Sequence, residues 1–432
     1  MTISATADRI FPILLVNFIG TLGYSIILPF MVVLVLKLGG NEMVYGILGA
    51  TYSFFQLIGA PVLGNLSDTY GRKKILVVSQ AGSFIGWMIF LMALLVPNTV
   101  LVTLHLNTPD LFILSIPLFL MFIARAVDGI TGGNISVANA YLADISPKPD
   151  RKKNFGKMAA ASNLGFIFGP VLAGVLGTTA LGNMLPVIVA AVISLAGIFV
   201  ISFQLKDVAP GRIEQPIVTC KASKLLLQEH KEGYNTHCRK IRLPAILGMP
   251  NISFMLLMYF LIFLAFNFYY VSFPMWAAES LHWGVFQLGI FFSFLSAVLV
   301  IVQGPVLSKI SAIVSDAKLV IAGSLVLAAS FIFFRSYNTV MIYCGALLLG
   351  IGNGIMWPSF LAILSNVGDD QYQGAIQGFA SSAGSLASII GLVTGAFLFD
   401  GLQSNIFLLT TFVMLVIAVS SVKLLHLKNY AK

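Results

Sequence analysis

Charged residues are scarce in this chain of 432 residues. Asp, Glu, Lys and Arg together make up 9% of it, whereas soluble proteins carry roughly a quarter. Hydrophobic residues make up 58%, and the mean hydropathy is +0.95. So little charge cannot cover the surface of a soluble chain of this length. Most of the surface must therefore face lipid, which excludes a soluble protein.

Side chains and motifs that serve covalent catalysis or nucleotide hydrolysis are also rare. The phosphate-binding pattern Gly-x-x-x-x-Gly-Lys-Ser/Thr does not occur, and no pair of carboxylates falls inside an expected membrane segment. We therefore expect neither an enzyme nor a nucleotide-driven pump, and neither a cofactor nor a metal. All five histidines fall in expected loops or at helix ends: His105, His230, His237, His282 and His426.

Long hydrophobic runs, by contrast, are abundant. A helix needs about 20 apolar residues to cross roughly 30 Å of hydrocarbon. The runs here are continuous rather than alternating, so they predict helices and not the strands of a barrel. The expected fold class is all-α integral membrane, with twelve transmembrane helices at Phe11–Leu36, Val44–Leu66, Ile75–Val96, Leu111–Leu142, Met158–Gly177, Met184–Phe203, Ile252–Phe273, Phe286–Leu307, Leu319–Phe334, Val340–Leu364, Ala375–Phe399 and Ile406–Leu425.

The formal net charge of +9 follows membrane topology rather than nucleic-acid binding. With the N-terminus in the cytoplasm, every Lys and Arg except Lys37, Arg125 and Arg335 falls in a cytoplasmic segment. This bias is the one described by the positive-inside rule. We expect both termini in the cytoplasm, the lipid bilayer of the cell (inner) membrane as surroundings, and no nucleic acid as partner.

One long polar segment, residues 206–249, divides the spans into six and six. It predicts an N-terminal bundle (1–205), a cytoplasmic linker loop (206–249) and a C-terminal bundle (250–432). The halves resemble each other, since Gly156 and Gly169 correspond to Gly378 and Gly391, and the Ala60–Gly64 segment corresponds to Gly304–Ser308. Duplicated six-helix halves around a central cavity are typical of secondary transporters.

Three motifs stand out in the first half. The segment Gly64–Lys74 (GNLSDTYGRKK) follows the second span. A basic loop that only fixes membrane topology would account for its lysines, but not for the Gly–Asp–Gly spacing at Gly64, Asp68 and Gly71. In the fourth span Arg125 and Asp128 are spaced i,i+3, so they can neutralise each other on one helix face. Charge inside a membrane is costly, so this pair is a candidate functional site.

The third motif lies in the fifth span. Small residues recur every four to five positions and make a smooth packing face, while the proline removes a backbone donor and kinks the helix. Its members are Gly165, Gly169, Pro170 and Gly174.

Together with Ala140–Asp144 and Asp370–Gly378, these motifs resemble those of the major facilitator superfamily, and best its tetracycline/proton antiporter-like branch of drug/proton exchangers. The resemblance implies two pseudo-symmetric six-helix bundles. It also implies that the Gly64–Arg72 segment latches a cytoplasmic gate, with Asp144 as the partner of Arg72. The glycine face of the fifth span would seal the interface against proton leakage in an antiporter.

The fourth-span motif of the family couples transport to protons, its arginine tuning a nearby proton carrier. Our hypothesis is that Asp128 takes up and releases the proton while Arg125 sets its proton affinity. The alternative is a permanent ion pair that only locks helices.

The chain also departs from the family. Thr69 stands where arginine is usual, Asp128 stands where glutamine is more usual, and the acids expected near Gly20 and Gly86 are missing. We therefore expect a cargo other than metal-chelated tetracycline.

In this superfamily the first, fourth, seventh and tenth spans line the cavity. Polar and aromatic residues at helical spacing in these spans are candidate substrate contacts, although each could equally serve an interhelical hydrogen bond or anchor a helix at the membrane interface. The candidates are Asn17, Thr21, Tyr24, Asn267, Tyr270, Asn353 and Trp357, with Gln56 and Asn163 in second rank. Their chemistry favours an amphipathic, aromatic, neutral-to-cationic solute over a polyanion.

The expected function is secondary active transport by alternating access, as proton-coupled antiport that expels a small amphipathic molecule or drug. The expected partners are that small-molecule substrate and protons, and we expect a monomer. The alternatives are a nutrient, metabolite or siderophore carrier working as uniporter or symporter, and a non-transporting receptor on the same fold.

Overall fold

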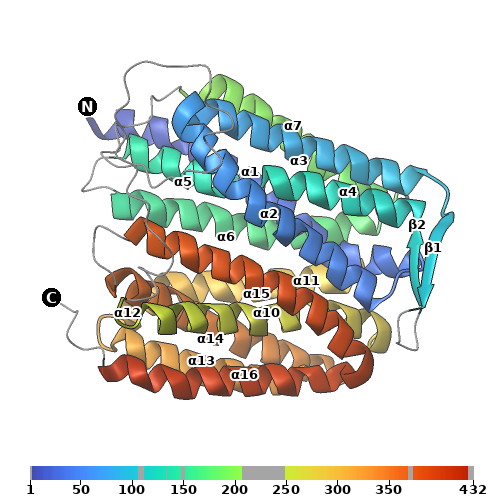
Figure 1. Ribbon diagram of the computed structural model, residues 1–432. Helices are drawn as coiled ribbons and strands as arrows, with labels where there is room; N and C mark the ends of the chain where they lie inside the picture. The colour runs from blue at the N-terminus through green and yellow to red at the C-terminus, as the bar shows by residue number, and fades with distance from the viewer. Residues whose placement is uncertain are drawn as a thin grey trace.

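A computed structural model describes residues 2–105, 111–132, 134–146, 151–206, 249–367 and 373–426 (Figure 1). Helices dominate, because in lipid each segment must satisfy its own backbone hydrogen bonds. The first half contains α1 (Thr2–Lys37), α2 (Glu42–Tyr70), α3 (Arg72–Leu95), α4 (Ile116–Thr131), α5 (Asn134–Ile145), α6 (Arg151–Gly177) and α7 (Met184–Gln204). The second contains α10 (Ile252–Ser280), α11 (Val285–Ile301), α12 (Leu307–Ile310), α13 (Asp316–Phe333), α14 (Thr339–Asn366), α15 (Gln373–Leu402) and α16 (Ile406–Ser421).

Ten helical stretches among the described residues are long and apolar enough to cross a membrane. The fourth expected span is not one of them. A turn at Gly132 divides it into α4 and α5, and each of these helices is too short to cross the membrane by itself. The last two spans form one stretch, since the 3-10 turn Gln403–Asn405 joins α15 directly to α16. When α4 and α5 are counted together as one span, and α15 and α16 as two, the described residues contain the twelve expected spans.

The expected start of the fourth span is wrong. Residues Leu111–Ser115 form strand β2, which pairs antiparallel with β1 (Val100–His105) in a hairpin. Helix α4 begins only at Ile116, with Pro117 in its first turn, where the missing N–H costs nothing. An apolar run of a few residues is compatible with a strand as well as a helix, so composition alone could not place this boundary.

Helices α1–α7 lie together on one side of the molecule and α10–α16 on the other (Figure 1). The two groups meet chiefly where α2 packs against α15 and α6 packs against α11. We call the end that carries β1 and β2 the hairpin end. The opposite end, where α1 begins and α16 finishes, is the terminal end. The predicted linker boundaries stay a prediction, because residues 207–248 lie outside the described part.

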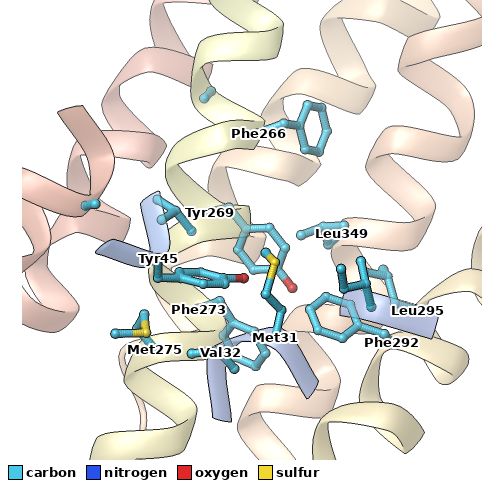
Figure 2. Packing of buried hydrophobic residues seen from close by; sticks show 14 of the residues in the cluster. Met31, Val32, Tyr45, Phe266, Tyr269, Phe273, Met275, Phe292, Leu295 and Leu349 are labelled. Atoms are coloured by element: carbon cyan, nitrogen blue, oxygen red, sulfur yellow. The ribbon is translucent and has the colours of Figure 1, made fainter. Parts of the chain in front are cut away.

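The largest hydrophobic core joins both groups near the hairpin end (Figure 2). Met31 of α1 and Tyr45 of α2 pack there with Phe266 and Phe273 of α10 and Phe292 of α11. In a membrane such side chains hold the groups together mainly through van der Waals packing and contacts between their rings.

Glycines show how closely the groups approach. A Cβ on Gly174 of α6 would lie 3.3 Å from the Phe286 Cα of α11, and one on Gly49 of α2 would lie 3.3 Å from the Leu392 side chain of α15. These contacts lie in the halves of the helices nearer the hairpin end. A Cβ would have no neighbour within 4 Å among the described residues at three glycines toward the terminal end of α2, α6 and α15, nor at one glycine of the π-helical segment Val302–Val306 that continues α11: Gly64, Gly156, Gly378 and Gly304. The groups are therefore in close contact at the hairpin end, where Gly49 and Gly174 meet the opposite group.

Candidate functional site

A cavity of about 580 Å³ lies between the two helix groups. Its lining comes from α1, α2, α4, α6, α10, α11, α14 and α15, so both groups contribute. The core near the hairpin end supplies part of this lining, including Met31, Tyr45 and Phe292. The volume lies within the range of roughly 300–1,000 Å³ found for small-molecule sites.

Aromatic side chains face this cavity from both groups. Tyr24 and Tyr52 of the first group lie 5.5 Å apart between ring centroids. In the second group Phe263 and Trp357 pack edge to face, 5.4 Å apart. Such walls provide a large apolar surface and electron-rich ring faces, which suit an aromatic or cationic solute.

A single charged side chain, that of Arg125, lines the cavity among the described residues. It is 4% exposed, and its Nη2 donates to Asp128 Oδ2 at 2.9 Å. The guanidinium carbon also lies 5.5 Å from the Tyr52 ring centroid and 6.0 Å from that of Trp87. The carboxylate compensates the charge, and the two rings hold the guanidinium in place by cation–π attraction.

Asp128 is turned away from the cavity. Its Oδ1 accepts a hydrogen bond of 2.8 Å from Ser83 of α3, and its side chain lines a second, smaller pocket of about 230 Å³ inside the first group. The pair thus spans a boundary, with the cation on the cavity side and the carboxylate on the other.

A second ion pair lies at the terminal end. Arg72 begins α3 and donates from Nε to Asp144 Oδ2 of α5 at 3.0 Å, and from Nη1 to Ser67 Oγ of α2 at 2.6 Å. Gly71 makes the sharp turn between α2 and α3 with a φ of 97°, a conformation that L side chains rarely adopt. Asp68 lies within α2, but its side chain is outside the described residues. These contacts tie α2, α3 and α5 together.

The glycine face of α6 serves two different neighbours. A Cβ on Gly165 would lie 2.8 Å from Leu22 N, and one on Gly169 would lie 3.0 Å from Ile26 N, so these glycines let α1 approach. Gly174 instead faces Gly289 of α11, whose added Cβ would meet the carbonyl oxygen of Pro170. One helix therefore packs against its own group and against the opposite group through glycines.

The sequence model of the Major Facilitator Superfamily matches residues 13–392 and, in a second match, residues 255–429. The chain belongs to the major facilitator superfamily. The tetracycline resistance protein, class C, of Escherichia coli is 27% identical to it over 350 residues, which cover 80% of this chain and 78% of that protein.

Two solved structures share the superfamily fold. The crystal structure of the human organic anion transporter MFSD10 (TETRAN) superimposes with a TM-score of 0.67 at 18% identity, covering 96% of this chain and 99% of that one. The crystal structure of a D-xylose-proton symporter gives a TM-score of 0.71 at 15% identity, covering 98% of both chains. The protein is thus a multi-pass membrane transporter related to tetracycline resistance proteins.

Most of the side chains predicted as substrate contacts in this superfamily member do line the cavity: Tyr24, Gln56, Asn163, Asn267, Tyr270, Asn353 and Trp357. Three of them also join elements, among them Asn163, which donates to Gln303 Oε1 of the opposite group at 3.5 Å. Asn267 donates to Ser388 Oγ of α15 at 3.0 Å, and Gln56 donates to the Gly132 carbonyl oxygen at 3.3 Å. Whether any of them contacts substrate stays a prediction.

Two predicted contacts lie elsewhere. Asn17 is 5% exposed and donates to the Met158 carbonyl oxygen at 3.1 Å and to Ser162 Oγ, which ties α1 to α6. Thr21 is bonded to its own helix and lines the smaller pocket instead. Both are α1 residues on a face that packs within the first group, a difference that helical spacing alone cannot reveal.

Sequence analysis did not single out Ser83, Gln80 or Tyr52. Ser83 and Tyr52 contact the Arg125–Asp128 pair from α3 and α2, and Gln80 lines the smaller pocket. A small polar residue in an apolar helix is a weak signal, because most such residues only bond their own helix. Their importance lies in contacts between helices, which the sequence does not display.

Proposed function

We propose that this protein is a proton-coupled antiporter that expels a small amphipathic organic molecule by alternating access. One observation carries the proposal: the Arg125 guanidinium lines the cavity, while the Asp128 carboxylate that compensates it, 2.9 Å away, lies behind it. Similarity to tetracycline resistance proteins supports efflux as the direction.

The arrangement links protonation to substrate binding through charge. While Asp128 is ionised, the pair is neutral and the cavity accepts a neutral or cationic solute. Once Asp128 is protonated, Arg125 faces the cavity uncompensated and repels a cation. For a separation of about 6 Å and an effective dielectric constant of about 20, the repulsion is about 3 kcal/mol, on the order of 100-fold in affinity. Proton and cation then exclude each other, which is the requirement for exchange.

The packing of the helix groups supports alternating access. We infer access from the terminal end in this state, because glycines bring the groups together at the hairpin end, whereas a Cβ added at Gly64, Gly156, Gly304 or Gly378 would meet no described atom within 4 Å. We place the terminal end, with both termini, in the cytoplasm, because nearly all Lys and Arg fall there by sequence. A monomer with bundles 1–205 and 250–432 suffices for this mechanism.

The test is a flux measurement in proteoliposomes, with radiolabelled tetraphenylphosphonium, an aromatic cation, as the probe. Antiport predicts that an acidic interior drives accumulation of the probe, because protons leave as it enters. An acidic exterior should drive no accumulation. Asp128→Asn leaves Arg125 uncompensated, as protonation does, so it should abolish the effect of the gradient and weaken probe binding on the order of 100-fold. Asp316→Asn changes an aspartate at the start of α13, remote from the cavity, and should behave like wild type.

Accumulation by the Asp128→Asn protein at the wild-type level would refute the role of this carboxylate. A wild-type protein that moves the probe with no response to either gradient would instead indicate a uniporter. Binding without any flux would indicate a receptor.

A second candidate is symport of an organic anion with a proton. The buried Arg125 Nε has no hydrogen-bond partner among the described residues, and it is the charge that the cavity presents. An anion would bind best when Asp128 is protonated, so both would travel together. In the same vesicles, fluorescein would then accumulate under an acidic exterior.

A further inference from the structure

The pocket behind Asp128 forms a separate chamber. Its volume of about 230 Å³ lies among α1, α2, α3, α4, α6 and α7, entirely within the first helix group. Four residues line both this side chamber and the central cavity, and so stand between the two spaces: Tyr24, Tyr52, Gln56 and Phe166. A ligand bound in the chamber would therefore contact Asp128 without occupying the central cavity.

The chamber contains a polar atom that lacks a partner. Gln80 is 2% exposed, and its Nε2 donates to the Ser194 carbonyl oxygen at 3.3 Å, but its Oε1 has no hydrogen-bond partner among the described residues. A buried acceptor left unbonded costs about 1–3 kcal/mol. Gln80 and Asp128 both line the chamber, so one ligand that donates hydrogen bonds could satisfy both.

The volume of the chamber and the charges around it indicate that this ligand is water. A water occupies about 30 Å³ of liquid and needs two to four polar partners, which Gln80, Ser83, Thr21 and Asp128 offer. A metal cation is disfavoured, because Arg125 already compensates the carboxylate at 2.9 Å. The titratable groups that face Asp128 are Arg125 on its own helix, Tyr24 of α1 and Tyr52 of α2.

We infer that the side chamber is a water site in which Gln80 holds ordered water against Asp128, and that this water delivers and removes the transported proton. The inference rests on the proposed antiport. A hydronium ion in the chamber gives its proton to an Asp128 carboxylate oxygen, which leaves neutral water and a carboxylic acid; release is the reverse. Gln80 acts as a positioning residue, and a proton that reaches Asp128 through the chamber weakens the binding of a cation in the central cavity.

The water itself can be detected without any transport. Difference infrared spectra of the purified wild-type protein, recorded between acidic and alkaline buffer, should contain a water O–H band that shifts in H₂¹⁸O. They should also contain a carboxylic acid band that Asp128→Asn removes. Gln80→Met, which keeps the side-chain volume but removes the acceptor, should eliminate the water band.

Transport then separates a positioning role from a structural one. Gln80→Met should reduce the maximal proton-for-tetraphenylphosphonium exchange rate about tenfold, with probe affinity within about twofold of wild type. Gln80→Asn, which keeps a carbonyl oxygen and leaves room for one more water, should restore most of the rate. Gln287→Met makes the same substitution at an exposed position of the hairpin end and should change neither quantity.

A wild-type protein without the ¹⁸O-sensitive band overturns the inference, as does a Gln80→Met protein that retains both the band and the wild-type rate. The proposed function fails differently: the band is then present, but no proton movement accompanies the probe.

Discussion

Two ion pairs of nearly the same geometry serve this protein in different surroundings. Arg72–Asp144 and Arg125–Asp128 join at 3.0 and 2.9 Å, and in both pairs the side chains are 5% and 13% exposed. Distance and burial therefore do not distinguish the predicted gate pair from the proposed proton site. The difference lies in the adjoining space, because only the second pair lies between a cavity and a chamber that could supply substrate and protons.

At the residue scale, Arg72→Ala should destabilise the protein by about 2 kcal/mol, because charged hydrogen bonds to Asp144 and Ser67 are lost in a buried position. The melting temperature of the purified protein in detergent reports the loss. Arg335→Ala is the matched control, since Arg335 is exposed and its loss should cost under about 0.5 kcal/mol.

Asp144→Ala and the double variant distinguish a pair from two independent residues. If the two side chains act through each other, the double variant should be barely less stable than either single one. Additive losses would show that Arg72 and Asp144 contribute separately and would remove the basis for a shared latch.

At the scale of elements, the sequence predicted helices well and their neighbours poorly. Continuous apolar runs are sufficient for a membrane helix, and the motif of α6 correctly indicated close packing. The sequence could not show that Gly165 and Gly169 face α1 whereas Gly174 faces α11, because that depends on how the helix is rotated. The same limit explains why Asn17 was predicted for the cavity but packs against α6.

The contact of α6 with α11 yields a prediction for a single glycine. A Cβ on Gly289 would lie 3.0 Å from Gly174 Cα and would meet the Pro170 carbonyl oxygen, and backbone atoms cannot rotate away. Gly289→Leu should therefore force the groups apart at the hairpin end. In a background without native cysteines, spin labels on Thr179→Cys and His282→Cys should report a longer distance than without the substitution.

Gly401→Leu is the control for this experiment. Gly401 also lies near the hairpin end, but no atom lies within 4 Å of its added Cβ among the described residues. The label distance should then stay at its original value. An unchanged distance in the Gly289→Leu protein would show that this contact does not hold the two groups together.

At the scale of the whole molecule, the distribution of basic residues and the internal repeat were the most informative features of the sequence. The basic bias predicts the orientation, and the repeated glycines predict equivalent packing: Gly169 contacts α1, and Gly391 contacts α10, the corresponding helix of the second group. What lies between the groups was harder to predict. The side chamber arises from α1, α2, α3, α4, α6 and α7 together, and only Asp128 among its polar residues carries a charge that could be recognised in the sequence.

The motif glycine Gly64 has no close neighbour among the described residues, since a Cβ added there would meet no atom within 4 Å. Gly64→Leu should therefore leave the melting temperature unchanged and the probe affinity within about twofold of wild type. The opposite state must bring the terminal ends of α2 and α15 together, as their other ends are now, and the leucine would block that approach. Exchange in proteoliposomes should fall at least about tenfold, while the label distance at the hairpin end stays short, opposite to Gly289→Leu. Exchange at the wild-type rate would mean that Gly64 never enters a close contact, and the gate role of its motif would be refuted.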